Sequence, residues 1–547
     1  IPSGIKTIAK GAFYDRYNLR SVTIPNTVTT IEMQAFDGCG LSSVTIPSCV
    51  NSIGQSAFAR CDNLTSIVVE SGNSKYDSHN NCNAIIETNK KTLIAGCRNT
   101  IIPNDVTSIG ASAFRYCTGL TSITIPNNVI SIEESAFEGC SNLKTISLPN
   151  GVTSIEDYTF SDCEGLTSIN IPNSVTNIGN YAFAHCTSIS NITIPNGVTT
   201  IGAHAFRECS SLTSLKLSES LTNVNDSAFV SCTALTSVDF HCKQVKKWFK
   251  GHASLKNLVF GDEVTSIMAN AFEDCTALNT VNLPNNVSTI NARTFANCAN
   301  ITTLSIGKKV SSITGSAFSG CDKISTIKFH SNKIDSWFNK RSSLKNVTIG
   351  SEVTYIGSNA FEGCTGLTSI SIPDNVAIIG PSAFQDCTGI TSVTIPEKVT
   401  QIGMKTFLGC SGLTSITMST GITTINSSAF DGCTKLTSLT IPSSVNYIGS
   451  SAFANCKSLA SMKLPDSVKV VNSSLFEGCA ALRSVSLSNK TTDIKASAFS
   501  GCSLLKSFSI PNTVTAIGEK AFQDCVSLTT INLPYSLANM ALTAFSG

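Results

Sequence analysis

The stretch Leu120–Asn142 reads LTSITIPNNVISIEESAFEGCSN, and close copies of it recur along almost the whole chain. The Phe of its Ala-Phe pair returns every 23 residues from Phe114 to Phe229, and again from Phe361 to Phe545. A fixed period in the twenties is typical of a solenoid, in which stacking of small units creates the core. The sequence therefore predicts a single repeat solenoid over 1–547 rather than several globular domains.

The apolar positions of this unit predict where its side chains lie. Ile123 and Ile125 alternate with polar residues, which is the period of a strand, and Pro126 ends the strand because it has no N–H to donate. Val129 and Ile132 predict a second short strand on the opposite wall. The Ala-Phe pair and the Cys that follows it fill the far side. We expect mostly β-structure and irregular coil, with little helix.

The pattern LxxIxIP…V..I…AF..C resembles the BspA-like, Treponema-type class of leucine-rich repeats over nearly the whole chain. The resemblance implies a right-handed leucine-rich repeat array of 23-residue units with its β-strands on the concave face. It also implies a cell-surface or secreted protein that binds host matrix proteins or other cells. No short motif marks a ligand site in this family, so the resemblance assigns no contact residue.

The cysteines follow the repeat, since nineteen of the 23 lie three residues after a repeat Phe. One cysteine per coil at a fixed interior position behaves as a small buried hydrophobe, so we favour a ladder of reduced thiols in the core. Disulfides along the ladder are the alternative for a secreted chain. Spacings such as CxxC, which are typical of zinc sites, are absent.

The period first breaks between Phe58 and Phe114, where we predict a β-hairpin insert at about 71–99. Its strands, 83–88 and 91–96, would pair around a turn at Asn89-Lys90.

This pairing predicts the register of the hairpin. Ala84 should face Ala95, and Ile86 should face Leu93. Cys82 would then lie opposite Cys97, where both a cross-strand disulfide and two separate core thiols are compatible with the sequence.

Two shortened repeats of 20 residues lie near 233–252 and 322–341. Phe249 and Phe338 take the core Phe position in them, and the only two tryptophans, Trp248 and Trp337, come directly before.

Basic residues crowd both tryptophans, among them Lys246, Lys247 and Arg341. With Trp248 and Trp337 they form candidate contact patches, since Trp and Arg are enriched at binding hot spots. We favour the alternative that the tryptophans pack over the shorter coils and the lysines are only solvated. A change in coil length by itself calls for a different core side chain.

Outward strand positions should line the concave wall, where the curvature of a solenoid creates an extended binding surface. This row is mostly Ser, Thr and Asn, and Lys216, Asp239, Lys328 and Lys463 interrupt it. We predict the binding face here. The alternative is that these hydroxyl groups only keep the strands soluble.

Composition narrows the class of protein. Charged residues make up 14% and the net charge is +2, so the chain lacks the basic character of a nucleic-acid-binding protein. No run of about 18 apolar residues predicts a transmembrane helix.

The chain begins and ends inside a repeat, so we expect a fragment of a longer parent that carries the export signal and the anchor. The resemblance implies an extracellular or cell-surface location.

The resulting hypothesis is a non-enzymatic protein for adhesion or protein binding, with no catalytic residue, no cofactor and no metal. None of the six histidines lies in a nucleophile or metal motif. A structural stalk or spacer that presents another domain is the main alternative. Binding to an ice or crystal surface, suggested by the hydroxyl rows, is a further one. The sequence leaves the oligomeric state open.

Overall fold

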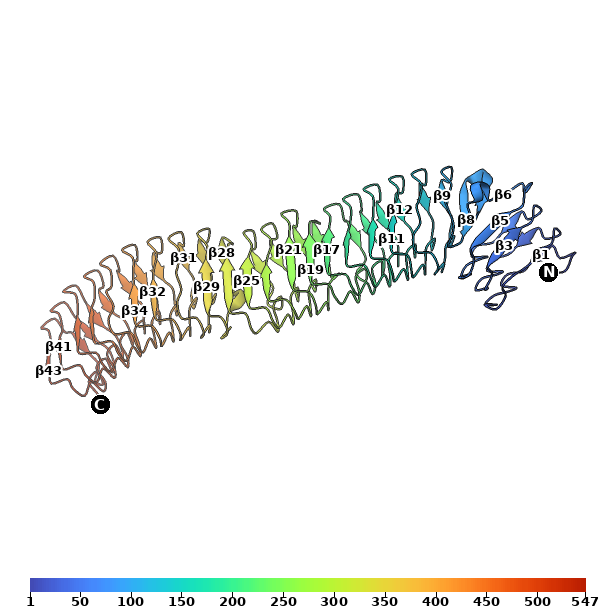
Figure 1. The fold of residues 1–547 in the computed structure, drawn as a ribbon. Helices are drawn as coiled ribbons and strands as arrows, with labels where there is room; N and C mark the ends of the chain where they lie inside the picture. The colour runs from blue at the N-terminus through green and yellow to red at the C-terminus, as the bar shows by residue number, and fades with distance from the viewer. The chain divides into compact units, whose positions relative to one another are not determined.

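The computed structural model describes residues 1–547, which form two compact units. Unit 1 comprises Ile1–Leu278 and Arg293–Cys298, and unit 2 comprises Asn279–Ala292 and Ala299–Gly547. Within each unit, coils of about 23 residues stack side by side through parallel strands (Figure 1). The predicted β-solenoid with little helix is confirmed, whereas a single domain over 1–547 stays a prediction.

In each unit the LxxIxI segments form small parallel sheets, and we call these strands together the long-strand row of that unit. In unit 1 it comprises β3 (Ser43–Ile46), β5 (Ser66–Val69), β11 (Thr145–Ser147), β13 (Ser168–Asn170), β15 (Asn191–Thr193), β17 (Ser214–Leu217), β19 (Ser237–Phe240) and β21 (Asn257–Phe260). In unit 2 it comprises β23 (Thr280–Asn282), β25 (Thr303–Ile306), β27 (Thr326–Phe329), β29 (Asn346–Ile349), β32 (Ser392–Thr394), β34 (Ser415–Thr417), β37 (Ser461–Lys463), β39 (Ser484–Ser486), β41 (Ser507–Ser509) and β43 (Thr530–Asn532).

The predicted second strand is also present, and its two-residue strands form a short-strand row. In unit 1 this row comprises β1 (Thr7–Ile8), β2 (Thr30–Ile31), β4 (Ser52–Ile53), β9 (Ser108–Ile109), β10 (Ser131–Ile132), β12 (Ser154–Ile155), β14 (Asn177–Ile178), β16 (Thr200–Ile201), β18 (Asn223–Val224), β20 (Gln244–Val245) and β22 (Ser266–Ile267). In unit 2 it comprises β24 (Thr289–Ile290), β26 (Ser312–Ile313), β28 (Lys333–Ile334), β30 (Tyr355–Ile356), β31 (Ile378–Ile379), β33 (Gln401–Ile402), β35 (Thr424–Ile425), β36 (Tyr447–Ile448), β38 (Val470–Val471), β40 (Asp493–Ile494), β42 (Ala516–Ile517) and β44 (Asn539–Met540).

Helical structure is limited to three single 3₁₀ turns, η1 (His79–Asn81), η2 (Thr88–Lys90) and η3 (Ser336–Phe338). No helix has the length and apolar character that crossing a membrane requires.

The predicted Phe ladder forms the core. Phe137 is fully buried, and its ring centroid lies 5.1 Å from that of Phe114 and 5.6 Å from that of Phe160. The planes are nearly parallel, with interplanar angles of 2° and 6°. Because strand pairing holds adjacent regular coils in register, the Phe of one coil lies against the Phe of the next. The rings therefore stack on one another.

The cysteines are free thiols, and all of them except Cys49 are buried. A repeat thiol donates its S–H to the carbonyl of the Phe in the preceding coil, as in Cys140 to Phe114 at 3.1 Å and Cys387 to Phe361 at 3.0 Å. Burial raises the pKa of thiols in the ladder, for Cys117 to about 12. The reduced ladder that the sequence favours is therefore present, and its thiols are poor nucleophiles.

The predicted hairpin is present as β7 (Ala84–Glu87) and β8 (Thr92–Gly96), with β6 (Tyr76–Asp77) antiparallel to β7 and β8 parallel to β9. The Ile86–Leu93 pair is confirmed. The pairing of Ala84 with Ala95 is wrong, because a β-bulge between Ile85 and Ile86 shifts the register and sets Ala84 against Gly96.

The cysteines of the hairpin are two separate buried thiols rather than a disulfide. The Cys82 thiol lies 3.7 Å from the Ala84 carbonyl, and the Cys97 thiol lies 3.4 Å from the Asn83 carbonyl.

Candidate binding surface

The outward side chains of the long-strand row are aligned in register within each sheet. Across β15, β17, β19 and β21 the aligned residues are Thr193, Lys216, Asp239 and Val259. In unit 2 the row across β23, β25, β27 and β29 is Asn282, Ser305, Lys328 and Thr348. The inward neighbours are buried, so each of these strands presents one side chain of this row to solvent, and Val259 is the one apolar member among the eight.

The structure separates two kinds of surface hydroxyl group. Threonines at the start of the strands join adjacent coils, as Thr213 does by donating to the Ser190 carbonyl at 3.1 Å. Thr236 donates in the same way to the Thr213 carbonyl. By contrast, the side chains of Thr394 and Thr417, which face each other between β32 and β34, form no hydrogen bond within the protein. The hydroxyl groups of Thr394 and Thr417 thus keep their hydrogen-bonding capacity available.

Two hollows open along this row. One, of about 560 Å³, lies over β13 and β15 and is lined by amide and hydroxyl groups that include Asn170, Asn191 and Thr193. The other, of about 470 Å³ in unit 2, is lined by Thr440, Lys463 and neighbouring residues. Both have a size suited to protruding side chains or a sugar ring of a partner.

The charged residues of the row are arranged in different ways. Lys216 and Asp239 are neighbours in register, and Oδ2 of Asp239 lies 3.1 Å from Nε2 of His241. Nδ1 of His241 lies 3.4 Å from a carboxylate oxygen of Glu263, so this imidazole joins two acidic residues. Sequence reasoning missed this pairing, because Glu263 lies in the next coil.

Lys328 and Lys463 are exposed on β27 and β37, which belong to different sheets of unit 2. The four charged candidates therefore occupy one kind of position on the coil but do not form one cluster.

The structure contradicts Trp248 as a surface contact. The residue is only 3% exposed, and its indole N–H donates to the Val224 carbonyl at 3.0 Å. The favoured packing interpretation holds for this tryptophan, since the shortened coil brings the indole over the short-strand row. Trp337 is half-buried.

The basic candidates near the tryptophans are mostly engaged. Nζ of Lys247 lies 3.2 Å from a carboxylate oxygen of Asp226, whereas Lys246 is half-buried. Arg341 donates to the carbonyls of Cys321 and Phe318, and burial lowers the pKa of its guanidinium. Lys247 and Arg341 therefore make contacts within the coil stack.

A buried carboxylate lies beside the first short coil. The Glu273 side chain is 5% exposed, accepts hydrogen bonds from Arg293, and lies 2.9 Å from Nζ of Lys250. Hydrogen bonds from Arg293, Lys250 and Asn270 lower the pKa of Glu273 from 4.5 to about 2. A carboxylate whose pKa is lower in the folded state stabilises the fold above its unfolded pKa, and that contribution disappears as the pH falls toward the folded value.

We therefore expect Glu273→Gln to lower the thermal midpoint at pH 7, and the gap from wild type to narrow between pH 4.5 and about 2. Thermal unfolding followed by circular dichroism at a series of pH values tests this. Glu519→Gln, at an exposed position, is the control and should follow wild type throughout. A pH-independent gap would mean that the charge of Glu273 does not stabilise the fold.

The repeat also identifies relatives of the chain. A family model described as the BspA type leucine rich repeat region matches six times, over residues 1–93, 92–187, 132–247, 243–337, 332–448 and 423–547. The chain belongs to the BspA-type leucine-rich repeat family. The repeats of this family are associated with protein binding and with surface proteins, and the solenoid is an interaction scaffold.

Solved structures of other leucine-rich repeat proteins are similar to this BspA-type chain. One, from Bacteroides ovatus, is 28% identical and covers 66% of this chain and 84% of its own, with a TM-score of 0.36. A leucine rich cell surface protein from Faecalibacterium prausnitzii is 25% identical over 62% of this chain and 88% of its own, with a TM-score of 0.29. A T. pallidum leucine rich repeat protein is 30% identical over 29% of this chain and 78% of its own, with a TM-score of 0.28. No curated protein sequence matches the chain.

Across residues 1–547, no group of three or more His, Cys, Asp or Glu side chains is placed to hold a metal ion.

Proposed function

We propose that this chain is a non-enzymatic adhesion or protein-binding module of a cell-surface or secreted protein. Its contact face is formed by the outward side chains of the long-strand row. The observation that carries the proposal is the in-register row of outward side chains in these sheets, mostly hydroxyl and amide groups, among which the side chains of Thr394 and Thr417 have no hydrogen-bond partner within the protein. Host extracellular matrix or the surface of another cell is the proposed partner.

The charge of the chain bears on how such a partner is held. With a net charge of +2 and few charged residues in the row, binding should depend on hydrogen bonds and shape more than on long-range electrostatic attraction. Affinity should therefore change little between low and physiological salt, since screening acts mainly on exposed charges.

Surface binding to a panel of matrix proteins, glycans and whole cells tests the proposal. The first variant places two arginines side by side on the face, as Thr394→Arg with Thr417→Arg. The second changes Lys216, Lys328 and Lys463 to Ser. A matched control changes three exposed lysines outside the row to Ser, at Lys435, Lys457 and Lys520.

We expect saturable binding by wild type and the control, and a loss of tenfold or more in at least one of the two face variants. Circular dichroism confirms that each variant is folded. Binding that both face variants retain would place the contact elsewhere and contradict the proposed face. No binding to any member of the panel would contradict adhesion and support the alternative of a stalk or spacer.

A further inference from the structure

Like the first coil, which has Arg16, the two short coils lack Cys at the position three residues after the core Phe. Most coils have Cys there, whereas the short coils have His252 and Arg341. Nε2 of His252 lies 2.8 Å from the Phe229 carbonyl, and Nη2 of Arg341 lies 3.0 Å from the Phe318 carbonyl. Both side chains therefore replace the thiol as the donor to the preceding coil.

Arg341 does more than replace the thiol. Its second terminal nitrogen, Nη1, donates to the Cys321 carbonyl at 2.8 Å. Its guanidinium carbon lies 5.7 Å from the centroid of the Phe338 ring, within the range of a cation–π contact. A guanidinium group thus occupies the space beside the second short coil, held by two carbonyls and one aromatic ring.

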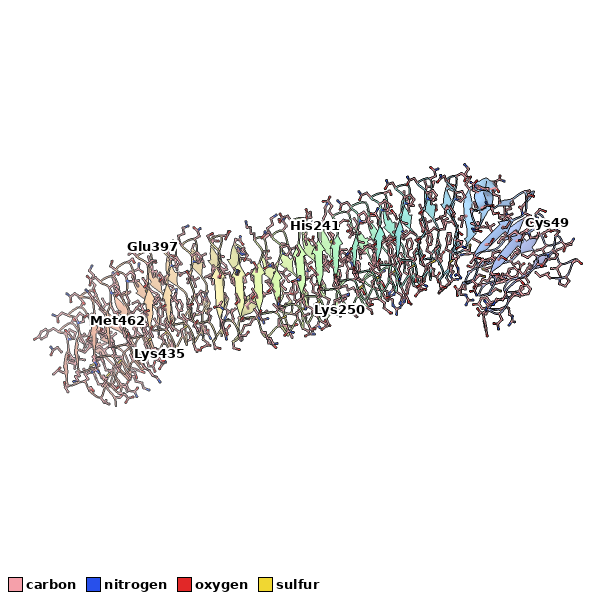
Figure 2. All side chains as sticks on the ribbon, in the orientation of Figure 1. Cys49, His241, Lys250, Glu397, Lys435 and Met462 are labelled. Carbon is pink, nitrogen blue, oxygen red and sulfur yellow. The ribbon has the colours of Figure 1, made fainter.

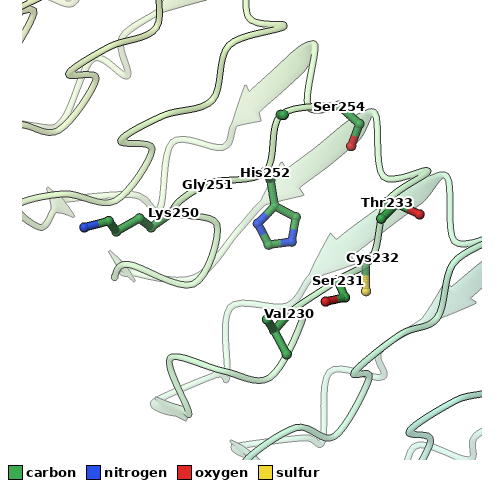
Figure 3. Close-up of a pocket in the computed structure, with 9 residues that line it drawn as sticks. Val230, Ser231, Cys232, Thr233, Lys250, Gly251, His252 and Ser254 are labelled. Atoms are coloured by element: carbon green, nitrogen blue, oxygen red, sulfur yellow. The ribbon is translucent and has the colours of Figure 1, made fainter.

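The corresponding space beside the first short coil is open. A hollow of about 610 Å³ lies between Val230–Thr233 and Lys250–Ser254 (Figure 3). His252 lines it, and the imidazole is shorter than an arginine side chain and reaches only the Phe229 carbonyl. The Cys232 carbonyl, which corresponds to that of Cys321, accepts a single N–H, from Leu235 at 3.1 Å. A carbonyl oxygen has a second lone pair, so Cys232 can accept another hydrogen bond.

The imidazole of His252 is itself satisfied on one side only. Nε2 of His252 donates to a carbonyl, so Nδ1 of the neutral ring is an acceptor, and Nδ1 is buried without a partner. The Phe249 ring lies edge-on to the imidazole, with 5.5 Å between the centroids. The Lys250 side chain extends away from His252, and its ammonium lies 2.9 Å from Glu273 (Figure 3). The Cys232 carbonyl, with one lone pair still available, therefore favours a ligand that brings an N–H donor, as Arg341 does at the Cys321 carbonyl.

We propose that this hollow binds a guanidinium group. The internal comparison identifies the ligand, because the equivalent coil of the same chain supplies a guanidinium from its own sequence. Figure 2 shows Lys250 and His241 at opposite edges of unit 1. The site is thus separate from His241 and its acidic partners, and it does not rest on the proposed adhesive face.

Ligand-observed saturation-transfer NMR with the full chain tests the proposal. N-acetyl-arginine amide represents an arginine of a polypeptide, agmatine represents a free guanidino compound, and N-acetyl-lysine amide is the cation control. We expect saturable binding in the millimolar range for at least one guanidino probe, and tenfold weaker binding for the lysine probe. Tighter binding of the arginine amide indicates a polypeptide ligand, and tighter binding of agmatine indicates a small molecule.

Two variants make the test specific to the hollow. His252→Arg should fill it with the side chain that the second short coil already uses, so binding should be lost while the fold is retained. Arg341→His should open the equivalent space in unit 2 and raise the number of bound probes. If Arg341→His fails to fold, the comparison of wild type with His252→Arg decides the question alone.

Absence of saturable binding to wild type would overturn the proposal, as would undiminished binding to a folded His252→Arg variant. Equal binding of the arginine and lysine probes would also overturn it, because the planar donor geometry would then play no part. Adhesion assays with the variants of the outward row are independent of these results.

Discussion

Replacing Phe384 by Ala should lower the free energy of unfolding by about 3–5 kcal/mol. The side chain is fully buried, and its ring centroid lies 5.5 Å from those of both Phe361 and Phe407. Strand pairing fixes the distance between coils, so the two neighbouring rings cannot close the gap. The cavity term therefore adds to the loss of buried apolar area.

The measurement is urea unfolding followed by circular dichroism. Hydrogen exchange in the neighbouring coils complements it, because repeat arrays can unfold in parts. Ile378→Ala is the control, since Ile378 is 51% exposed and should change stability by no more than about 0.5 kcal/mol. An unchanged midpoint for Phe384→Ala would contradict the assignment of the Phe ladder to the core.

The second large effect is expected at Trp248. Replacing it by Ala should cost about 3–5 kcal/mol, because truncation removes a buried indole and leaves the Val224 carbonyl without its donor. Trp337→Ala is the matched comparison at the equivalent position of the second short coil. Since Trp337 is half-buried, its truncation should cost less than that of Trp248.

Denaturant unfolding of both variants, measured beside wild type, distinguishes a tryptophan that packs in the core from one that contacts a ligand. A pure contact residue at position 248 would lower ligand binding and leave the unfolding midpoint unchanged. Trp248→Phe should recover part of the lost stability, because the benzene ring restores apolar burial but cannot donate a hydrogen bond to Val224. If both tryptophans prove equally dispensable for stability, the packing interpretation fails.

The repeat pattern predicts the regular part of the fold well, because one period fixes strand, ladder and register together. The row that contains Thr193 and Lys216 could be predicted because the same coil position recurs in every unit. The register of the hairpin could not. The bulge of the hairpin accompanies a 3₁₀ turn at Thr88–Lys90 and a left-handed backbone conformation at Lys91. The residue types in this turn do not by themselves indicate a bulge.

The candidate site could be predicted only in part. Thr213 and Thr417 occupy different positions of the repeat, but the sequence does not reveal that only the position of Thr213 brings its hydroxyl group within hydrogen-bonding distance of a carbonyl of the preceding coil. His252 was recognisable in principle, since counting three residues from Phe249 places it at the ladder position. Its significance depends on the contacts of Arg341, which the sequence does not reveal.

The spacing of the contacts between coils has a consequence for how such a gene can change. Hydrogen bonds between full-length coils link residues 22 to 26 positions apart, as in Thr199 to Thr176 and Cys186 to Phe160. Excision or duplication of 23 residues joins each donor to an equivalent acceptor, so recombination between repeats yields another foldable chain. The number of coils can therefore change one coil at a time. The length of the solenoid then changes while the residues that form its core stay the same.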